Sequence, residues 1–186
     1  MVAEFVSGAR PGRDDPRWAE SGAQDRLEYE FWAWRTCGIA CLRMVLGHRG
    51  EVVPRAVPLA ERCTVVGGYI RHRTYVDGLI YAPFVRWIEG DFGIKAEVHP
   101  ELDVGRIVDN VHDGGLAMIS VHPTIRTPWQ TPPHRGGHLV LVTGYDTGGL
   151  LVHNPSGLPG ESQRHARVGF DVLGRFYAGR GIVIRP

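Results

Sequence analysis

The pattern of hydrophobic residues changes character at the glycine pair Gly114-Gly115. Before this pair, residues 37–48, 54–63, 80–92 and 102–112 place apolar side chains at helical spacing, and the run 94–99 alternates as a strand does. After the pair come β-rich runs at 116–122, 138–145, 150–153 and 181–184, with one helix expected within 168–177. Helices followed by neighbouring strands predict an α+β fold, in which N-terminal helices pack on a C-terminal antiparallel sheet.

Size and charge limit the classes of function. A chain of 186 residues is long enough to bury one hydrophobic core, and we expect a single domain over residues 18–186, preceded by a loose arm over residues 1–17. The formal net charge of +1 gives no reason to expect nucleic acid as a partner. No apolar run reaches the roughly 20 residues of a membrane span. Without the apolar stretch of a secretory signal, we expect a cytoplasmic location.

The cysteines are expected to be free thiols. Cys37, Cys41 and Cys63 cannot all pair with one another, and a reducing compartment keeps thiols reduced. No CxxC repeat or HExxH motif occurs, so no metal and no other cofactor is expected. Cys41, one turn after Cys37, is expected in the core.

Cys37 stands at a position that favours nucleophilic chemistry. It begins the predicted helix 37–48, where unpaired N–H groups and the helix dipole favour an anion, so we expect a lowered thiol pKa. Gly38 follows and leaves the approach to the sulfur uncrowded. A thiol nucleophile also needs a base and proton donor, which is usually a histidine.

His138 and Asn154 are candidates for the rest of such a site. His138 begins one strand and Asn154 follows its partner strand, and the turn between them at residues 146–149 is typical of a hairpin. The start of one hairpin strand lies beside the end of the other, so we expect the two residues to meet. An asparagine beside a histidine fixes the tautomer of its ring. His153 is expected to point to the opposite face of the sheet.

Each of these residues also has an ordinary structural explanation. Cys37 can be a small core residue, His138 can begin a strand without any chemistry, and Asn154-Pro155 is a common turn pair. The individual residues therefore leave a catalytic site and a structural role both open.

Two longer segments resemble one family of enzymes. The segment TCGIACLRMVLGHRG (residues 36–50) is similar to the nucleophile helix of the C39-like branch of the papain-like cysteine peptidases, and GGHLVLVTGYD (136–146) with LLVHNPSG (150–157) resembles its histidine strand and Asp/Asn-Pro turn. Between them, an LAER stretch, a glycine pair, a helix ending in FGI and the segment LDVGRIVDNVHDGG follow the family's usual order. The resemblance covers residues 31–157.

The resemblance implies a papain-like fold and a role for each candidate. Cys37 would be the nucleophile, His138 the general base and acid, and Asn154 the residue that orients the histidine. The implied substrate is a peptide, and a leader peptide is one form of it.

The chain departs from the family at one position. The family usually carries a glutamine six residues before the cysteine, and its amide forms part of the oxyanion hole, whereas this chain has Phe31 there. The backbone N–H of Cys37 remains, and the indole N–H of Trp32 or Trp34 is a candidate for the second donor. Loss of one such donor lowers the rate by about 10²–10³.

Aromatic and glycine residues near the motifs are candidates for a substrate cleft. Phe31 and Gly38 lie beside the nucleophile in the sequence, and Gly137 directly precedes His138. Trp129 belongs to a long loop before His138, and a loop of that length is either a lid or specificity wall or a mobile surface segment. The aromatic residues before Cys37 can equally belong to the core.

Three functions follow from these observations. The first is a cysteine peptidase that cleaves a peptide through a Cys37 thioester. The second is an amide-forming acyltransferase on the same three residues, in which an amine replaces water. The third is a catalytically weak or silent peptide-binding module, which the missing glutamine favours.

Overall fold

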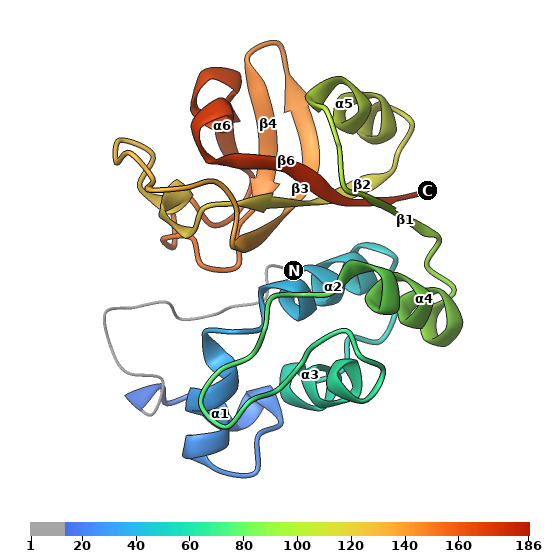
Figure 1. Cartoon of the computed structure of the whole chain (residues 1–186), viewed down its shortest axis with the longest axis vertical. Coiled ribbons are helices and arrows are strands. Elements are labelled where there is room, and N and C mark those ends of the chain that lie inside the picture. Colours follow the sequence, from blue (N-terminus) through green and yellow to red (C-terminus); the bar gives the residue numbers. More distant parts are fainter. Residues whose placement is uncertain (1–13) are drawn as a thin grey trace.

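A computed structural model describes residues 14–186 of the chain, so residues 1–13 of the predicted arm lie outside the described part. Figure 1 shows two halves, one built from helices α1 to α4 and the other from a β-sheet with α5 and α6. The predicted α+β class is confirmed, as is the order of N-terminal helices followed by an antiparallel sheet.

The helical half follows the predicted periodicities closely. It contains the 3-10 helix η2 (Trp18–Ser21) and the α-helices α1 (Arg26–Ala33), α2 (Cys37–His48), α3 (Ala56–Val65) and α4 (Tyr81–Phe92). Asp25 caps α1 by accepting a hydrogen bond from the Glu28 N–H at 2.8 Å. Gly93 ends α4 in the left-handed conformation, with φ of 62°. Within residues 14–186, no helix is both long and apolar enough to cross a membrane.

The sheet is antiparallel throughout, with the strand order β1-β6-β2-β3-β4-β5. Its strands are β1 (Ala96–His99), β2 (Leu116–Val121), β3 (His138–Asp146), β4 (Gly149–His153), β5 (Ala166–Gly169) and β6 (Tyr177–Ile184). The remaining elements are α5 (Val104–His112), η3 (Pro123–Arg126) and α6 (Phe170–Phe176).

Two core layers enclose the sheet. Leu139 and Leu141 of β3 face the helical half and join a cluster with Ile39 and Leu42 of α2. Val140, the residue between them, faces the other side and belongs to the cluster that includes α5 and α6. Because both faces of β3 are covered, residues 138–142 are all buried. A hydrophobic run without a polar face is what a strand in such a position requires.

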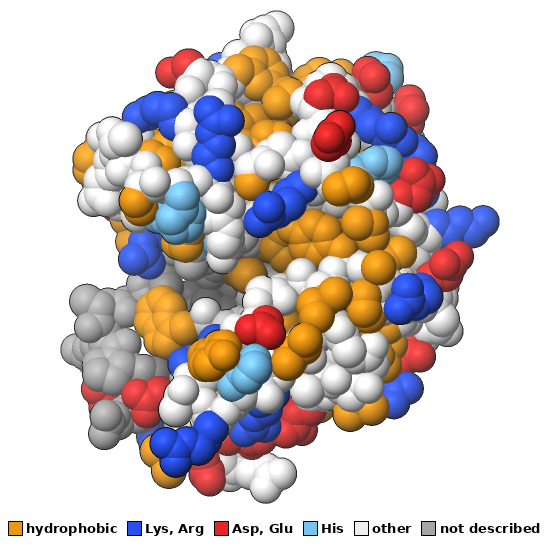
Figure 2. Space-filling model, viewed as in Figure 1, with side chains coloured by type: hydrophobic (Ala, Val, Ile, Leu, Met, Phe, Trp, Pro, Cys, Tyr) orange, Lys and Arg blue, Asp and Glu red, His pale blue; other side chains and the backbone are white. Residues whose placement is uncertain are grey.

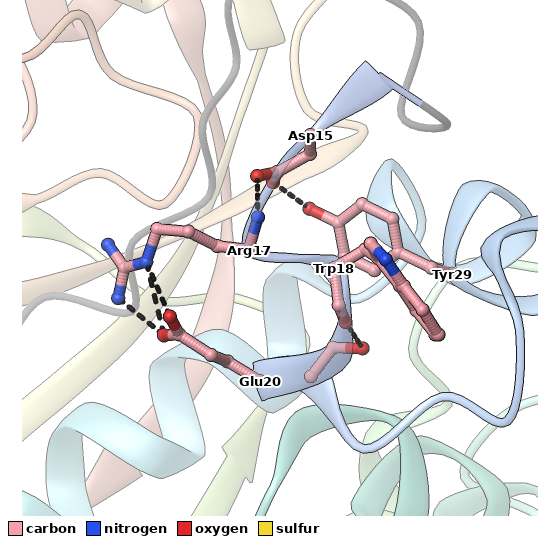
Figure 3. A network of polar contacts seen from close by, with 6 residues as sticks. Asp15, Arg17, Trp18, Glu20 and Tyr29 are labelled. Carbon is pink, nitrogen blue, oxygen red and sulfur yellow. Dashed lines mark hydrogen bonds and ion pairs between the residues drawn. The ribbon is translucent and has the colours of Figure 1, made fainter.

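The first described residues contact the domain rather than extending from it. The Tyr29 hydroxyl donates to Asp15 Oδ2 at 2.5 Å, and the Arg17 guanidinium lies 2.6 Å from Glu20 Oε2 (Figure 3). Asp15 therefore already contacts the folded part of the chain, whereas the sequence predicted that the domain begins at Trp18.

Candidate active site

The amino end of α2 lies against the start of β3. The Cys41 thiol donates to the Leu139 carbonyl at 3.7 Å, and the backbone N–H of Leu139 hydrogen-bonds the sulfur of Cys37. Pairing of β3 with β4 begins only at Leu141, so α2 occupies the edge of β3 that β4 leaves free. Cys37 and Cys41, one helical turn apart, thus interact with the backbone N–H and C=O of Leu139, the residue that follows His138. All three cysteines are free thiols, and Cys41 lies in the core as expected.

A tight turn fixes Asn154. Its backbone carbonyl accepts from the Gly157 N–H at 3.0 Å, and its backbone N–H donates to the Gln163 carbonyl at 2.8 Å. The side-chain Oδ1 accepts from the Ser156 N–H at 3.0 Å, which makes an Asx turn. The side chain is therefore held from within its own turn, and the residue is 1% exposed.

The predicted meeting of His138 and Asn154 is confirmed, with His138 Nε2 2.8 Å from Asn154 Oδ1. The two residues are not cross-strand partners, because a bulge between Val142 and Gly144 shifts the register and β4 ends at His153. The turn after β4 brings Asn154 back to the ring instead. Ser156 Oγ lies 3.1 Å from the same nitrogen. A carbonyl oxygen only accepts, so Nε2 carries the proton in the neutral ring and Nδ1 is left as the base.

Burial sets the protonation of both reactive groups. Burial lowers the pKa of His138 to about 4. The hydrogen bond to Asn154 acts to raise this pKa, and the nearby Arg126 and His122 lower it further. Burial also raises the pKa of the Cys37 thiol, although N–H groups of Leu139, Gly38 and Cys37 oppose the rise. The expected lowering of the thiol pKa by the helix terminus is therefore wrong, because desolvation outweighs it. Thiol and imidazole are both neutral at pH 7.

Cys37 and His138 open into one cavity between the two halves of the molecule. Its volume is about 480 Å³, and its wall includes Gly137 and Leu139 as well as the two reactive residues. Figure 2 shows hydrophobic side chains gathered in the hollow between the halves. Gly137 has the place in the cleft that the sequence predicted, with a φ of 99° that favours glycine.

The residues considered for the oxyanion hole lie elsewhere. Trp32 is buried in the core, and its indole N–H has no partner among the described residues. Trp34 is 51% exposed. Phe31, which replaces the expected glutamine, is enclosed by the guanidinium groups of Arg35 and Arg71 at 4.8 and 4.5 Å from its ring centre. None of the three aromatic residues is part of the cavity wall.

The other cleft candidates divide between two places. Gly38 is buried behind Cys37, and a Cβ there would lie 2.9 Å from Leu79 and 3.2 Å from the Tyr69 hydroxyl. Trp129 borders a second cavity of about 220 Å³ on the far side of Asn154, not the one that contains Cys37. The long loop thus lines a separate pocket, which Asn154 also borders.

His153 does not take part in the site, as the sequence predicted. Its Nδ1 accepts from the His165 N–H at 3.1 Å, and the two rings are 4.3 Å apart.

Several residues of the cavity had no signal in the sequence. Tyr81, Ser120 and Arg180 come from α4, β2 and β6 and share the wall with Cys37. No motif contains them, because the strand order alone brings β6 beside β2. Ser156 was part of the quoted turn, but its contact with the ring depends on the Asx turn.

Two solved structures with a similar fold are described as peptidases of the C39 type or as peptidase domains. The peptidase domain of Streptococcus ComA, described as a bifunctional ABC transporter involved in quorum sensing, matches with a TM-score of 0.57 at 16% identity, over 82% of this chain and 93% of that domain. A Bacillus anthracis protein assigned as a C39-like peptidase matches with a TM-score of 0.60 at 15% identity, over 82% of this chain and 89% of that protein. No protein-family model matches the sequence, and no curated protein matches it significantly. The chain therefore has the fold of C39 peptidase domains.

Proposed function

We propose that this chain is a cysteine peptidase-like enzyme that forms a thioester at Cys37. The observation that carries the proposal is the hydrogen bond of 2.8 Å between His138 Nε2 and Asn154 Oδ1. It lies beside a cavity whose wall includes both Cys37 and His138. The fold of C39 peptidase domains supports it. The substrate class is a peptide or a related acyl compound, and a leader peptide is one form of it.

The first step transfers a proton before the sulfur attacks. Because both groups are neutral at rest, Nδ1 of His138 takes the thiol proton as Cys37 attacks the carbonyl carbon. The charge that develops on the imidazole is stabilised by Asn154 Oδ1, which accepts the Nε2–H.

The second step releases the amine and then the acid. The protonated His138 gives its proton to the leaving nitrogen, the carbon–nitrogen bond breaks, and a thioester to Cys37 remains. Water then attacks the thioester with His138 as base, which restores the thiol and releases the carboxylic acid. An amine in place of water would give the acyltransferase reaction on the same residues.

The backbone N–H of Cys37 is one candidate donor for the oxyanion. Cys37 is the first residue of α2, so its backbone N–H has no partner within the helix. A peptidase with a single donor is expected to be about 10²–10³ slower than one with two.

The test compares the parent with Cys37→Ala and with Cys41→Ala as the matched control. An electrophilic thiol probe with peptide mapping by mass spectrometry should modify Cys37 ahead of Cys41 and Cys63, because Cys37 alone borders the cavity. Labelling should be lost in Cys37→Ala and kept in Cys41→Ala. Equal labelling of Cys37 and Cys41 in the folded parent would contradict the proposal.

A second candidate, a peptide-binding module without turnover, is favoured by two observations. The pKa of the Cys37 thiol is raised, and Phe31 offers no donor. For such a module, Cys37→Ala would bind peptide as the parent does, and no acyl-enzyme would form in the parent.

A further inference from the structure

Among residues 14–186, the wall of the catalytic cavity carries positive charge without any acid. Arg180 is the one charged residue of this described wall, and no aspartate or glutamate of that range borders it. Cys37 and Tyr81 each begin a helix, so the amino ends of α2 and α4 both meet at the cavity. Neither helix has a side-chain cap at that end, which leaves N–H groups and a positive dipole end toward the cavity.

Three side chains converge beside the reactive pair. A Cβ placed on Gly136 would lie 3.0 Å from Ser120 Oγ and 3.4 Å from Arg180 Nη2, so the hydroxyl and the guanidinium approach the same point. Burial raises the pKa of Tyr81, and the nearby Ser120 and Arg180 oppose this rise, so the Tyr81 hydroxyl faces the same two groups. Ser120 is 3% exposed and Tyr81 is half-buried, whereas Arg180 reaches solvent.

Arg180 forms no ion pair with another described residue. Ion pairs among residues 14–186 involve other cations. A guanidinium with a neighbouring tyrosine and serine hydroxyl provides the donors that a carboxylate accepts in a fork.

The distance to the nucleophile is short. Ser120 is the register partner of Leu139, the residue after His138. Neighbouring strands lie about 4.8 Å apart, so a carboxylate bound here would be about one residue from the scissile bond.

We propose that Arg180, Tyr81 and Ser120 form a carboxylate-binding subsite of the catalytic cavity, which selects acyl substrates with a carboxylate about one residue from the reacting carbonyl. The inference rests on the proposed function and names its substrate class. The carboxylate is either the free carboxyl terminus of a short leaving segment or the side chain of an acidic residue.

The experiment uses reagents that need no known substrate. N-iodoacetylglycine and N-iodoacetylglycinamide both alkylate thiols, forming a carbon–sulfur bond as iodide leaves and the thiol proton is lost, and they differ only in the carboxylate. We expect the acid to alkylate Cys37 about threefold to tenfold faster than the amide, the range of a partly exposed charged hydrogen bond. Arg180→Gln should abolish this preference, so that the acid and the amide alkylate Cys37 at equal rates in that variant.

Arg86→Gln is the matched control. Arg86 is also exposed, lies on α4, and is not part of the cavity wall, so its loss makes the same change in net charge. The preference for the acid should persist in this variant. Tyr81→Phe should lower the preference without removing it.

The outcomes separate the two proposals. Selective alkylation of Cys37 at equal rates by acid and amide would overturn the subsite and leave the proposed function standing. Alkylation of Cys37 no faster than Cys41 would overturn the proposed function and the subsite with it. A second pair of reagents, the α-amides of N-iodoacetylaspartate and N-iodoacetylasparagine, tests a side-chain carboxylate in the same way. If the acid-to-amide rate ratio is larger for the glycine pair, the subsite binds a carboxyl terminus; if it is larger for the aspartate and asparagine pair, it binds an acidic side chain.

Discussion

His138 is the residue on which burial and chemistry act together. It is 8% exposed, lies between the cavity of Cys37 and the turn of Asn154, and stays neutral down to about pH 4. A resting ion pair with the thiol is not expected, because the pKa of Cys37 is raised as that of His138 is lowered. The proton therefore moves during the attack, which makes the tautomer set by Asn154 decisive.

Acid stability should report the buried imidazole. The unfolded ring takes up a proton near pH 6.5, whereas the folded ring does so only near pH 4, so its contribution is complete above pH 6.5 and is lost as the pH falls toward 4. The difference corresponds to about 3 kcal/mol in the free energy of unfolding. Urea unfolding at pH 7 and pH 4.5 should therefore show a smaller loss in His138→Gln than in the parent. His48→Gln, which removes an exposed histidine at the end of α2, is the control, and an unchanged loss in His138→Gln would refute the assignment.

The substitution Asn154→Asp should raise the pKa of His138. A carboxylate beside the ring favours the imidazolium, by about 1–3 pH units for an opposite charge at this distance. The titration of the ring can be followed by NMR, which also reports whether Nε2 carries the proton in the parent. A ring that titrates at the same pH in both proteins would show that residue 154 does not face it in solution.

At the scale of elements, the turn after β4 is what assembles the site. The sequence predicted α2 at its observed bounds. Its long apolar periodicity lies between Thr36 and the glycines Gly47 and Gly50, and such a pattern is compatible with few structures other than a helix. The sequence also predicted that His138 and Asn154 meet, but by cross-strand pairing. The bulge near Thr143 shifts that register. Gly144 is a local signal of a bulge, since an isolated glycine within a strand often marks one, but it does not give the shifted register.

The remaining elements show why strands were harder to predict than helices. Strand β6 begins at Tyr177 rather than at residue 181, because Gly179 and Gly181 interrupt its hydrophobic pattern. Strand β5 over Ala166–Gly169 was not predicted, since it is short and lies at the edge of the sheet. Both depend on pairing with distant strands, which local patterns do not contain.

Gly157 tests whether the turn is held by close backbone packing. A Cβ there would lie 2.3 Å from the Ser162 carbonyl oxygen, so Gly157→Ala must move one of the two segments that hold Asn154. We expect a loss of about 1–3 kcal/mol in the free energy of unfolding. Gly90→Ala, within α4 and with open space around it, should instead stabilise the protein by about 0.5–1 kcal/mol. Equal effects of the two substitutions in urea unfolding would count against the tight turn.

At the scale of the whole molecule, the site lies where the two halves meet. The helical half contributes Cys37 and Tyr81, and the sheet half contributes His138, Ser120 and Arg180. The sequence motifs identified Cys37 and His138, because each of these residues lies within a short, continuous motif. Ser120 and Arg180 are brought together by the pairing of β6 with β2 in the sheet, which only the fold reveals.

Formation of an acyl-enzyme tests the central claim most directly. With p-nitrophenyl acetate, we predict a burst of one p-nitrophenolate per chain, with the acetyl group mapped to Cys37 by mass spectrometry. Cys37→Ala should give no burst, and His138→Ala should slow acylation by about 10²–10⁴ as expected for the loss of a general base. No burst in the parent, or an acetyl group found on Lys95 or Cys41 instead of Cys37, would contradict the assignment of Cys37 as the nucleophile.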